Sequence, residues 1–218
     1  ERKDNPRMNL LTLAEIEAAA QTVYRAMPPT PQYRWPLLSE HVGTEVWLKH
    51  ENHTPVGAFK LRGGLVYFSQ LQKQNGVIAA TRGNHGQSVA FCARQYRMSA
   101  TIVVPHGNSV EKNAAMRSLG ATLIEHGHDF QAALEHAQSL AGNRGLHMVP
   151  SFNLLLVAGV ASASLELFRA VPDLGTLYVP IGLGSGICAA AAVRNALGLS
   201  TEIVGVVSAH APAYANSF

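Results

Sequence analysis

Short apolar runs alternate with longer amphipathic segments along the chain, and this pattern predicts the fold. The runs typical of buried strands lie at 77–80, 101–104, 121–124, 176–180 and 203–207. Helical periodicity is found at 84–96, 110–119, 129–140, 154–170 and 185–197. Because strands alternate with helices, we expect βαβ units and therefore parallel-rich sheets that are covered by helices on both faces.

The N-terminal quarter of the chain has fewer strand signals and many prolines. A helix is predicted at 13–20, where Thr12 and Glu15 have the spacing of a capping box. A proline-rich stretch at 28–36 ends this helix. The next predicted elements are a strand at 45–50 and a helix at 59–72.

Composition narrows the classes of protein to which the chain can belong. Apolar residues make up 47% and charged residues 14%, which fits a folded α/β protein and argues against a disordered one. The formal net charge is only +3 and no dense Lys/Arg tract is present, so no nucleic-acid partner is expected. No apolar run is long enough to span a bilayer, and the first residues lack the pattern of a signal peptide, so no membrane partner is expected. Cys92 and Cys188 are expected to be buried free thiols, which favours the cytoplasm.

Three loops follow predicted strands, at 83–86, 105–108 and 182–186. Ligands of parallel sheets gather at the carboxyl ends of the strands, so these loops are candidate binding segments. The last loop consists of Gly182, Leu183, Gly184, Ser185 and Gly186. Its glycines allow close backbone approach, and the helix start behind it offers free N–H groups, so it is a candidate phosphate cradle. The alternative is a tight strand-to-helix turn that needs glycine only for packing.

The turn at 81–86 combines glycines with polar side chains. It contains Thr81, Arg82, Gly83, Asn84, His85 and Gly86. Successive N–H groups at a helix start can hold a carboxylate, so this turn is a candidate substrate site. The alternative is an Asn84 side chain that caps the helix beside a surface His85.

Lys60 falls in the first turn of the helix predicted at 59–72, between Phe59 and Leu61. A positive charge is disfavoured at a helix N-terminus and among apolar neighbours. The pKa of Lys60 is therefore expected to be low, which would make its amine a better nucleophile. The alternative is a solvated lysine that extends away from the helix.

In this order, the motifs resemble the fold-type II pyridoxal-phosphate (PLP) enzymes of the tryptophan synthase β-like superfamily. The matching stretches are Ala58-Phe59-Lys60 followed by Arg62-Gly63, then Gly83-Asn84-His85-Gly86, then the glycine loop after Val179-Pro180. Within that family the chain is most similar to the threonine/serine dehydratases. This similarity extends from about Thr12 to the last residues.

The resemblance implies a role for each candidate residue. Lys60 would carry PLP as a Schiff base and would later move the proton on the substrate Cα. The other cofactor contacts would come from Phe59, Asn84, Gly182, Leu183, Gly184, Ser185 and Gly186. The substrate pocket would be lined by Thr81, Arg82, Gly83, Asn84 and His85. Because PLP stabilises a carbanion at Cα, the β-hydroxyl would leave, and a 2-oxo acid and ammonia would form.

The sequence departs from the family pattern in several respects. Arg82 stands where serine-racemising relatives use a serine as the second acid or base, and an arginine is a poor proton shuttle, so racemisation is disfavoured. No acidic ligands lie at 207–210, where relatives with a divalent cation carry them, so no metal is predicted. His126, His128 and His136 are expected to be surface or helix-face residues and not metal ligands. The chain is also shorter than family members, so we interpret it as truncated at its C-terminus.

The sequence thus predicts an α/β fold with two lobes. Residues 57–146 would form the smaller lobe with the Schiff-base lysine, and residues 1–56 plus 147–218 an incomplete larger lobe with the phosphate loop. The predicted function is a PLP-dependent ammonia-lyase that converts L-threonine or L-serine, as a cytoplasmic homodimer in amino-acid metabolism. The alternatives are another PLP reaction on a small amino acid (racemisation, β-replacement, or elimination from another hydroxy or diamino acid), a truncated inactive PLP-binding protein, and a nucleotide-binding α/β protein.

Overall fold

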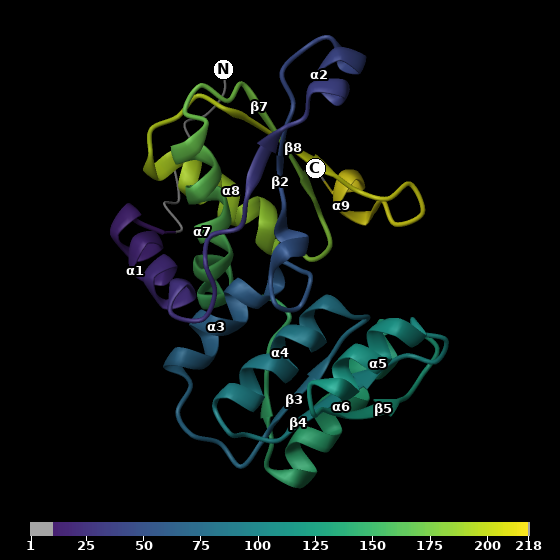
Figure 1. Ribbon diagram of the computed structural model, residues 1–218. Coiled ribbons are helices and arrows are strands. Elements are labelled where there is room, and N and C mark those ends of the chain that lie inside the picture. Colours follow the sequence, from purple (N-terminus) through teal and green to yellow (C-terminus); the bar gives the residue numbers. More distant parts are fainter. Residues whose placement is uncertain (1–10, 218) are drawn as a thin grey trace, which may run out of the picture.

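The computed structural model describes residues 11–217, whose strands form three sheets with helices packed around them (Figure 1). The helices are α1 (Leu13–Tyr24), α2 (Pro36–Val42), α3 (Lys60–Gln70), α4 (Asn84–Gln95), α5 (Val110–Ser118), α6 (Phe130–Arg144), α7 (Leu154–Ala170), α8 (Ser185–Ala196) and α9 (Ala213–Asn216), with a 3-10 turn η1 (Glu51–His53). The strands are β1 (Gln32–Arg34), β2 (Trp47–Lys49), β3 (Val77–Ala80), β4 (Ala100–Val104), β5 (Thr122–Glu125), β6 (His147–Met148), β7 (Thr176–Pro180) and β8 (Glu202–Val206). The predicted α/β alternation is confirmed.

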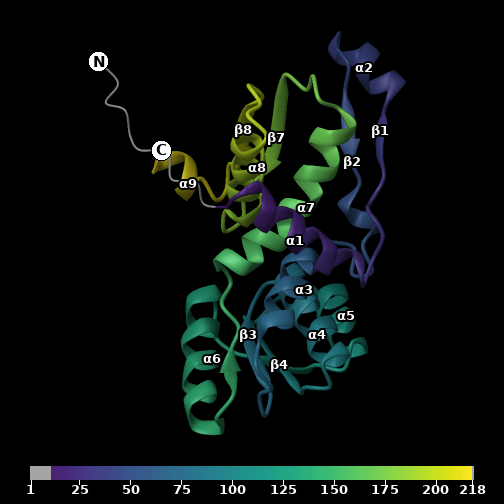
Figure 2. The same ribbon diagram turned by 90° about the vertical axis from the view of Figure 1, so that its left-hand side faces the viewer.

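A four-stranded parallel sheet in the order β5-β4-β3-β6 lies between two layers of helices. Helix α6 covers one face, and α4 and α5 cover the other (Figure 2). The side chains of β3 alternate accordingly: Val77 and Ala79 join the core beneath α4, whereas Ile78 and Ala80 pack against α6. Because both faces are buried, this strand is an uninterrupted apolar run.

The second parallel sheet pairs β7 with β8, and α8 packs against both strands. Figure 1 shows these elements in its upper part together with α1, α7 and the antiparallel pair β1 and β2, while the four-stranded sheet fills the lower part. Helix α3 lies where the two groups meet, packed against α4 on one side and α7 on the other. The chain therefore has the predicted two-lobed α/β fold.

Several elements begin and end where their local sequence signals indicate. The Oγ1 atom of Thr12 accepts a hydrogen bond from the Glu15 N–H at 3.3 Å, and the Glu15 carboxylate accepts one from the Thr12 N–H at 2.7 Å, which completes the predicted capping box. Helix α7 and strand β7 have their predicted bounds. The sequence did not predict β1, α2 or β6, because strands of two or three residues carry almost no periodicity and α2 buries no side chain.

Two further expectations concern the cysteines and the membrane. Cys92 and Cys188 are both free thiols; Cys92 is buried as predicted, and Cys188 is half-buried. Within residues 11–217, no helix combines the length and the apolar character that a bilayer crossing requires.

Candidate active site

Lys60 is the first residue of α3, and its amine lies at the glycine loop of the other lobe. Its Nζ atom donates a hydrogen bond of 2.6 Å to Oγ of Ser185, which is 125 residues further along the chain. Burial lowers the pKa of the Lys60 ammonium, the direction expected from its apolar surroundings. A larger fraction of this amine is thus neutral and nucleophilic than in a solvated lysine, so the alternative of a surface lysine does not apply.

The loop at 182–186 follows β7, and its last two residues begin α8. Gly184 has a φ of 93°, which favours glycine, and α8 begins at the next residue without a side-chain cap. A Cβ atom added at Gly182 or Gly184 would meet nothing within 4 Å. The first N–H groups of a helix lack partners within it and lie at the positive end of its dipole, so this loop can bind an anion.

The ring of Phe59 lies beside both the lysine and the glycine loop. The centroid of its ring is 5.4 Å from Nζ of Lys60. The same ring stands 3.6 Å from the position that a Cβ at Gly186 would take. The lysine, the loop and an aromatic surface therefore adjoin one another.

The turn at 81–86 is organised around a buried threonine. Oγ1 of Thr81 accepts hydrogen bonds from the N–H groups of Gly83, at 3.0 Å, and Gly86, at 3.3 Å. A Cβ at Gly83 would stand 2.3 Å from Cδ of Lys112, so the lysine stem packs directly on this turn. The turn is joined to the Lys60 helix because Oγ of Ser88, in α4, donates a hydrogen bond of 2.9 Å to the Lys60 carbonyl.

His85 is buried close to Lys60, with 8% of its surface exposed. Its ring is hydrogen-bonded to the backbone of Val149, and its Nε2 atom has no partner among the described residues. Burial, and then the charge of Lys60, lower the pKa of His85 to about 4, although the bond to Val149 raises it. The alternative of a surface histidine is therefore wrong: a neutral imidazole with one unpartnered nitrogen lies beside the reactive lysine.

The remaining predicted site residues are at the rim of this group. Asn84 is the first residue of α4 and makes no capping hydrogen bond, so the alternative of an asparagine cap is wrong as well. Asn84, Arg82 and Leu183 are all exposed, and within the described structure no hydrogen bond or ion pair joins them to Lys60.

The residues of the site fit pyridoxal phosphate. Lys60 offers a buried amine with a lowered pKa for the aldehyde group. The loop at 182–186 and the start of α8 offer N–H groups for the phosphate. The ring of Phe59 and the unpartnered Nε2 of His85 offer an apolar face and a polar contact for the rest of the molecule.

Sequence reasoning missed the ion pairs that lie directly behind Lys60. Arg62 is fully buried and bonds to Glu51 and to Glu166 of α7. A signal was available, because an acidic residue in the apolar pattern of α7 is seldom buried without a charged partner. Its partner was not readable from the sequence, since Arg62 and Glu166 are 104 residues apart.

Metal-binding side chains do not gather in the described structure. Across residues 11–217, no group of three or more His, Cys, Asp or Glu side chains could hold a metal ion. His126 and His128 are exposed, whereas His136 is half-buried and stacks on His126 with ring centroids 3.8 Å apart.

Comparison with known proteins agrees with the geometry. Residues 23–218 match the family described as "Pyridoxal-phosphate dependent enzyme". The biosynthetic L-threonine dehydratase of Haemophilus influenzae is 37% identical over 175 residues, covering 78% of this chain and 34% of that protein. The L-threonine ammonia-lyase of Thermotoga maritima is 32% identical over 207 residues, covering 93% of this chain and 52% of that protein. The solved structure of maize serine racemase superposes with a TM-score of 0.89 at 24% identity, covering 95% of this chain and 64% of that one.

The chain therefore spans about a third of one curated relative and about half of the other. The family match nevertheless takes in both lobes, from the last residues of α1 to the end of the sequence. From its sequence, its fold and the residues around Lys60, the chain belongs to the family of fold-type II pyridoxal-phosphate dependent enzymes.

Proposed function

We propose that this protein is a PLP-dependent ammonia-lyase that converts L-threonine or L-serine to a 2-oxo acid and ammonia. The observation that carries the proposal is the 2.6 Å hydrogen bond from Lys60 Nζ to Ser185 Oγ, because it puts a buried amine at the candidate phosphate loop. The two curated relatives named above, a threonine dehydratase and a threonine ammonia-lyase, support the reaction type.

The proposed chemistry needs a base near Cα and a group that accepts electrons. PLP, when bound, supplies an electron sink for the pair left at Cα after its proton is removed. Lys60 has a lowered pKa and lies within the site, so its amine can take that proton. The β-hydroxyl leaves as water, and a water molecule is consumed when the nitrogen departs as ammonia.

We propose that the start of α4 binds the substrate carboxylate through the turn at 81–86. Two N–H groups of this turn donate to Thr81 and hold its shape, which supports a preformed site for the carboxylate at the remaining N–H groups. Residues 57–146 would bring this turn and Lys60 to the phosphate loop of the larger lobe. The small amino-acid substrate, the homodimer and the cytoplasmic location are part of the same proposal.

Racemisation is the second candidate, and the fold shared with maize serine racemase favours it. Arg82 opposes it, because a side chain that does not deprotonate cannot serve as the second acid or base. Product analysis separates the two reactions, since an ammonia-lyase releases a 2-oxo acid and a racemase releases the D-amino acid.

Cofactor absorbance and borohydride fixation test the proposal. Wild type and Lys73→Ala, which removes an exposed lysine, are expected to show a visible PLP band that borohydride fixes to Lys60. Lys60→Ala is expected to lose the fixed cofactor, and wild type to release a 2-oxo acid from L-threonine or L-serine. A fixed cofactor without turnover would indicate another PLP reaction or an inactive PLP-binding protein. If borohydride fixes no cofactor in folded wild type, the proposal is wrong.

A further inference from the structure

Arg62 uses its whole guanidinium group inside the protein. Its side chain has no exposed surface, and its Nε and Nη2 atoms donate to Glu51 at 2.7 and 2.9 Å. Its Nη1 and Nη2 atoms donate to Glu166 at 2.6 and 2.9 Å. Further bonds reach Oγ of Ser162 at 2.8 Å and Oγ1 of Thr30 at 3.1 Å. Two bidentate carboxylate pairs therefore hold one planar group in a single orientation.

Lys49 completes a cluster of balanced charges. Its Nζ atom donates to Glu166 at 2.5 Å and to the carbonyl of Thr30 at 2.6 Å. We call Lys49, Glu51, Arg62 and Glu166 the charge cluster. Burial alone would raise the pKa of Glu166, but hydrogen bonds and charges from Arg62 and Lys49 outweigh it and hold that pKa below its usual value. Two carboxylates and two cations therefore meet in this cluster, and loss of any one would leave an unpaired buried charge.

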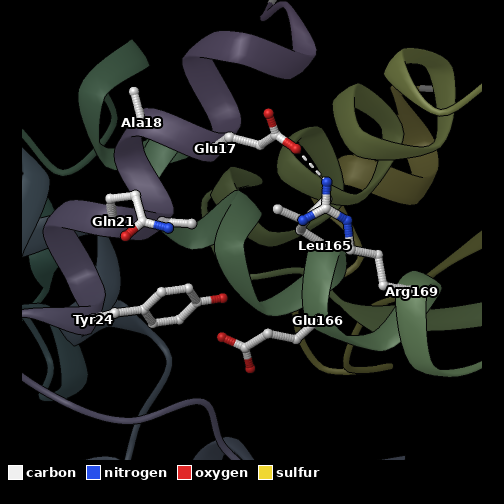
Figure 3. A pocket seen from close by; sticks show the side chains of 8 residues that line it. Glu17, Ala18, Gln21, Tyr24, Leu165, Glu166 and Arg169 are labelled. Carbon is white, nitrogen blue, oxygen red and sulfur yellow. Dashed lines mark hydrogen bonds and ion pairs between the residues drawn. The ribbon is translucent and has the colours of Figure 1, made fainter.

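A tyrosine and a cavity lie on the α1 side of the charge cluster. A cavity of about 450 Å³ lies between α1 and α7, with Glu166 and Tyr24 facing each other inside it and the ion pair of Glu17 with Arg169 beside them (Figure 3). Burial, and then the charge of Glu166, raise the pKa of Tyr24 to about 12, so its hydroxyl keeps its proton and points at the carboxylate. The charge cluster is therefore reached from α1 through this cavity, whereas the Lys60 amine faces α8.

The charge cluster acts on the same helical turn that carries Lys60. Lys60 and Arg62 are two residues apart in the first turn of α3, so their side chains leave the helix about 200° apart. Phe59, at the N-cap of α3, supplies no capping hydrogen bond. On the α7 side, a Cβ at Gly159 would stand 2.2 Å from the Arg62 carbonyl oxygen, so the two backbones touch at this turn.

We propose that the charge cluster is a positioning device for Lys60. The ion pairs of Arg62 fix the start of α3 against η1 and α7, and Lys49 ties β2 to the same Glu166 carboxylate. This orientation directs the Lys60 amine to Ser185 on the opposite side of the helix. The inference rests on the proposed function, in which that amine holds the cofactor. Arg62 itself is a positioning residue, because its side chain bonds to acidic and hydroxyl groups behind the site.

Two variants separate geometry from charge. Arg62→Lys keeps the positive charge but loses the planar fork, and Glu166→Gln keeps the shape but loses one negative charge. Phe168→Leu is the matched control, because Phe168 is a buried residue of α7, the helix that carries Glu166, and takes no part in the ion pairs. Tyr24→Phe is a second control that leaves the four charges in place.

Two readouts follow Lys60 in each variant. The first is the rate at which PLP and borohydride label the Lys60 peptide, measured by mass spectrometry. The second needs no cofactor: it is the pKa of Lys60, obtained from the pH dependence of its reaction with an amine reagent. We expect Arg62→Lys and Glu166→Gln to be labelled about tenfold more slowly, because small displacements of reacting groups cost rate steeply. We also expect the pKa of Lys60 in these two variants to rise toward that of a solvated lysine. Both controls are expected to match wild type in labelling rate and in the pKa of Lys60, although Phe168→Leu is expected to have a lower Tm.

The outcomes decide the proposal. Labelling of both cluster variants within about twofold of wild type, with an unchanged Lys60 pKa, would show that the charge cluster only stabilises the fold and would overturn the inference. If either cluster variant does not fold, Ser162→Ala replaces it; it removes one acceptor of Arg62 without leaving a charge, and unchanged labelling there would also overturn the inference. If wild type is not labelled at Lys60, the proposed function fails, while the pKa readout still tests the positioning of Lys60.

Discussion

At the scale of single residues, His85 has a titration behaviour that can be measured without the cofactor. Its pKa is about 4 in the folded protein, whereas the ordinary value for histidine is 6.5. Between these values the unfolded chain binds a proton that the folded protein does not bind. The free energy of unfolding must therefore rise as the pH increases through this window.

His85→Gln is expected to remove most of this dependence. The contribution of one such histidine is roughly 2 kcal/mol between about pH 5 and pH 7.5. Urea unfolding of wild type and variant at both pH values measures it. His210→Gln, at an exposed histidine, is the control and should keep the wild-type slope. An equally steep pH dependence in His85→Gln would show that His85 is not the buried neutral group described above.

At the scale of elements, α3 and α7 pack with their backbones in contact. A Cβ at Gly63 would stand 2.6 Å from the carbonyl oxygen of Leu156, and one at Gly159 would stand 2.2 Å from that of Arg62. Both glycines have ordinary helical backbones, so close approach, and not an unusual φ, requires them here. Helix α3, which carries Lys60, is thereby held firmly against α7.

Gly159→Ala is expected to lower the free energy of unfolding by more than about 2 kcal/mol, because backbone atoms cannot move aside as a flexible side chain can. Gly142→Ala in α6 is the matched control, since a Cβ there would meet nothing within 4 Å. It is expected to raise the free energy of unfolding by about 0.5–1 kcal/mol, through helix propensity. Urea denaturation of both variants checks the contrast, and a shift of both in the same direction would contradict it.

At the scale of the whole molecule, the site exists because the start of α3 meets the loop that follows β7. The hydrogen bond between Lys60 and Ser185 joins the start of α3 to the loop after β7. Ser185 is buried, with 1% of its surface exposed, so its hydroxyl is directed into the site. The hydrogen bond between Ser185 and Lys60 therefore lies where the two lobes meet.

Ser185→Ala is expected to weaken PLP binding about tenfold, the effect of losing one hydrogen bond to a charged group. Titration of the protein with PLP, followed by absorbance, measures this change. Ser139→Ala, at an exposed serine of α6, is the control and should bind PLP as wild type does. Equal affinities in wild type and Ser185→Ala would mean that the Ser185 hydroxyl does not contribute to the cofactor site.

The sequence by itself determined those features that depend on residues close to one another along the chain. The capping box at Thr12, the bounds of α7 and β7, the placement of Lys60 in the first turn of α3, and the order of the motifs all follow from local periodicity and from glycine and capping signals. The family and its cofactor followed from the same motifs, because the residue types of the motifs and their order along the chain can be recognised without any knowledge of distances. The exposed or buried state of His85 did not, and the surface alternative considered for it was wrong.

The tertiary structure alone decided which distant residues meet. It pairs Lys60 with Ser185 across 125 residues and Arg62 with Glu166 across 104, and it buries His85 against Val149. The short strand β1 likewise exists only through its pairing with β2. Ion pairs and hydrogen bonds of this kind leave no periodic trace in a sequence, because their geometry is set by how two packed lobes close around one helix, α3.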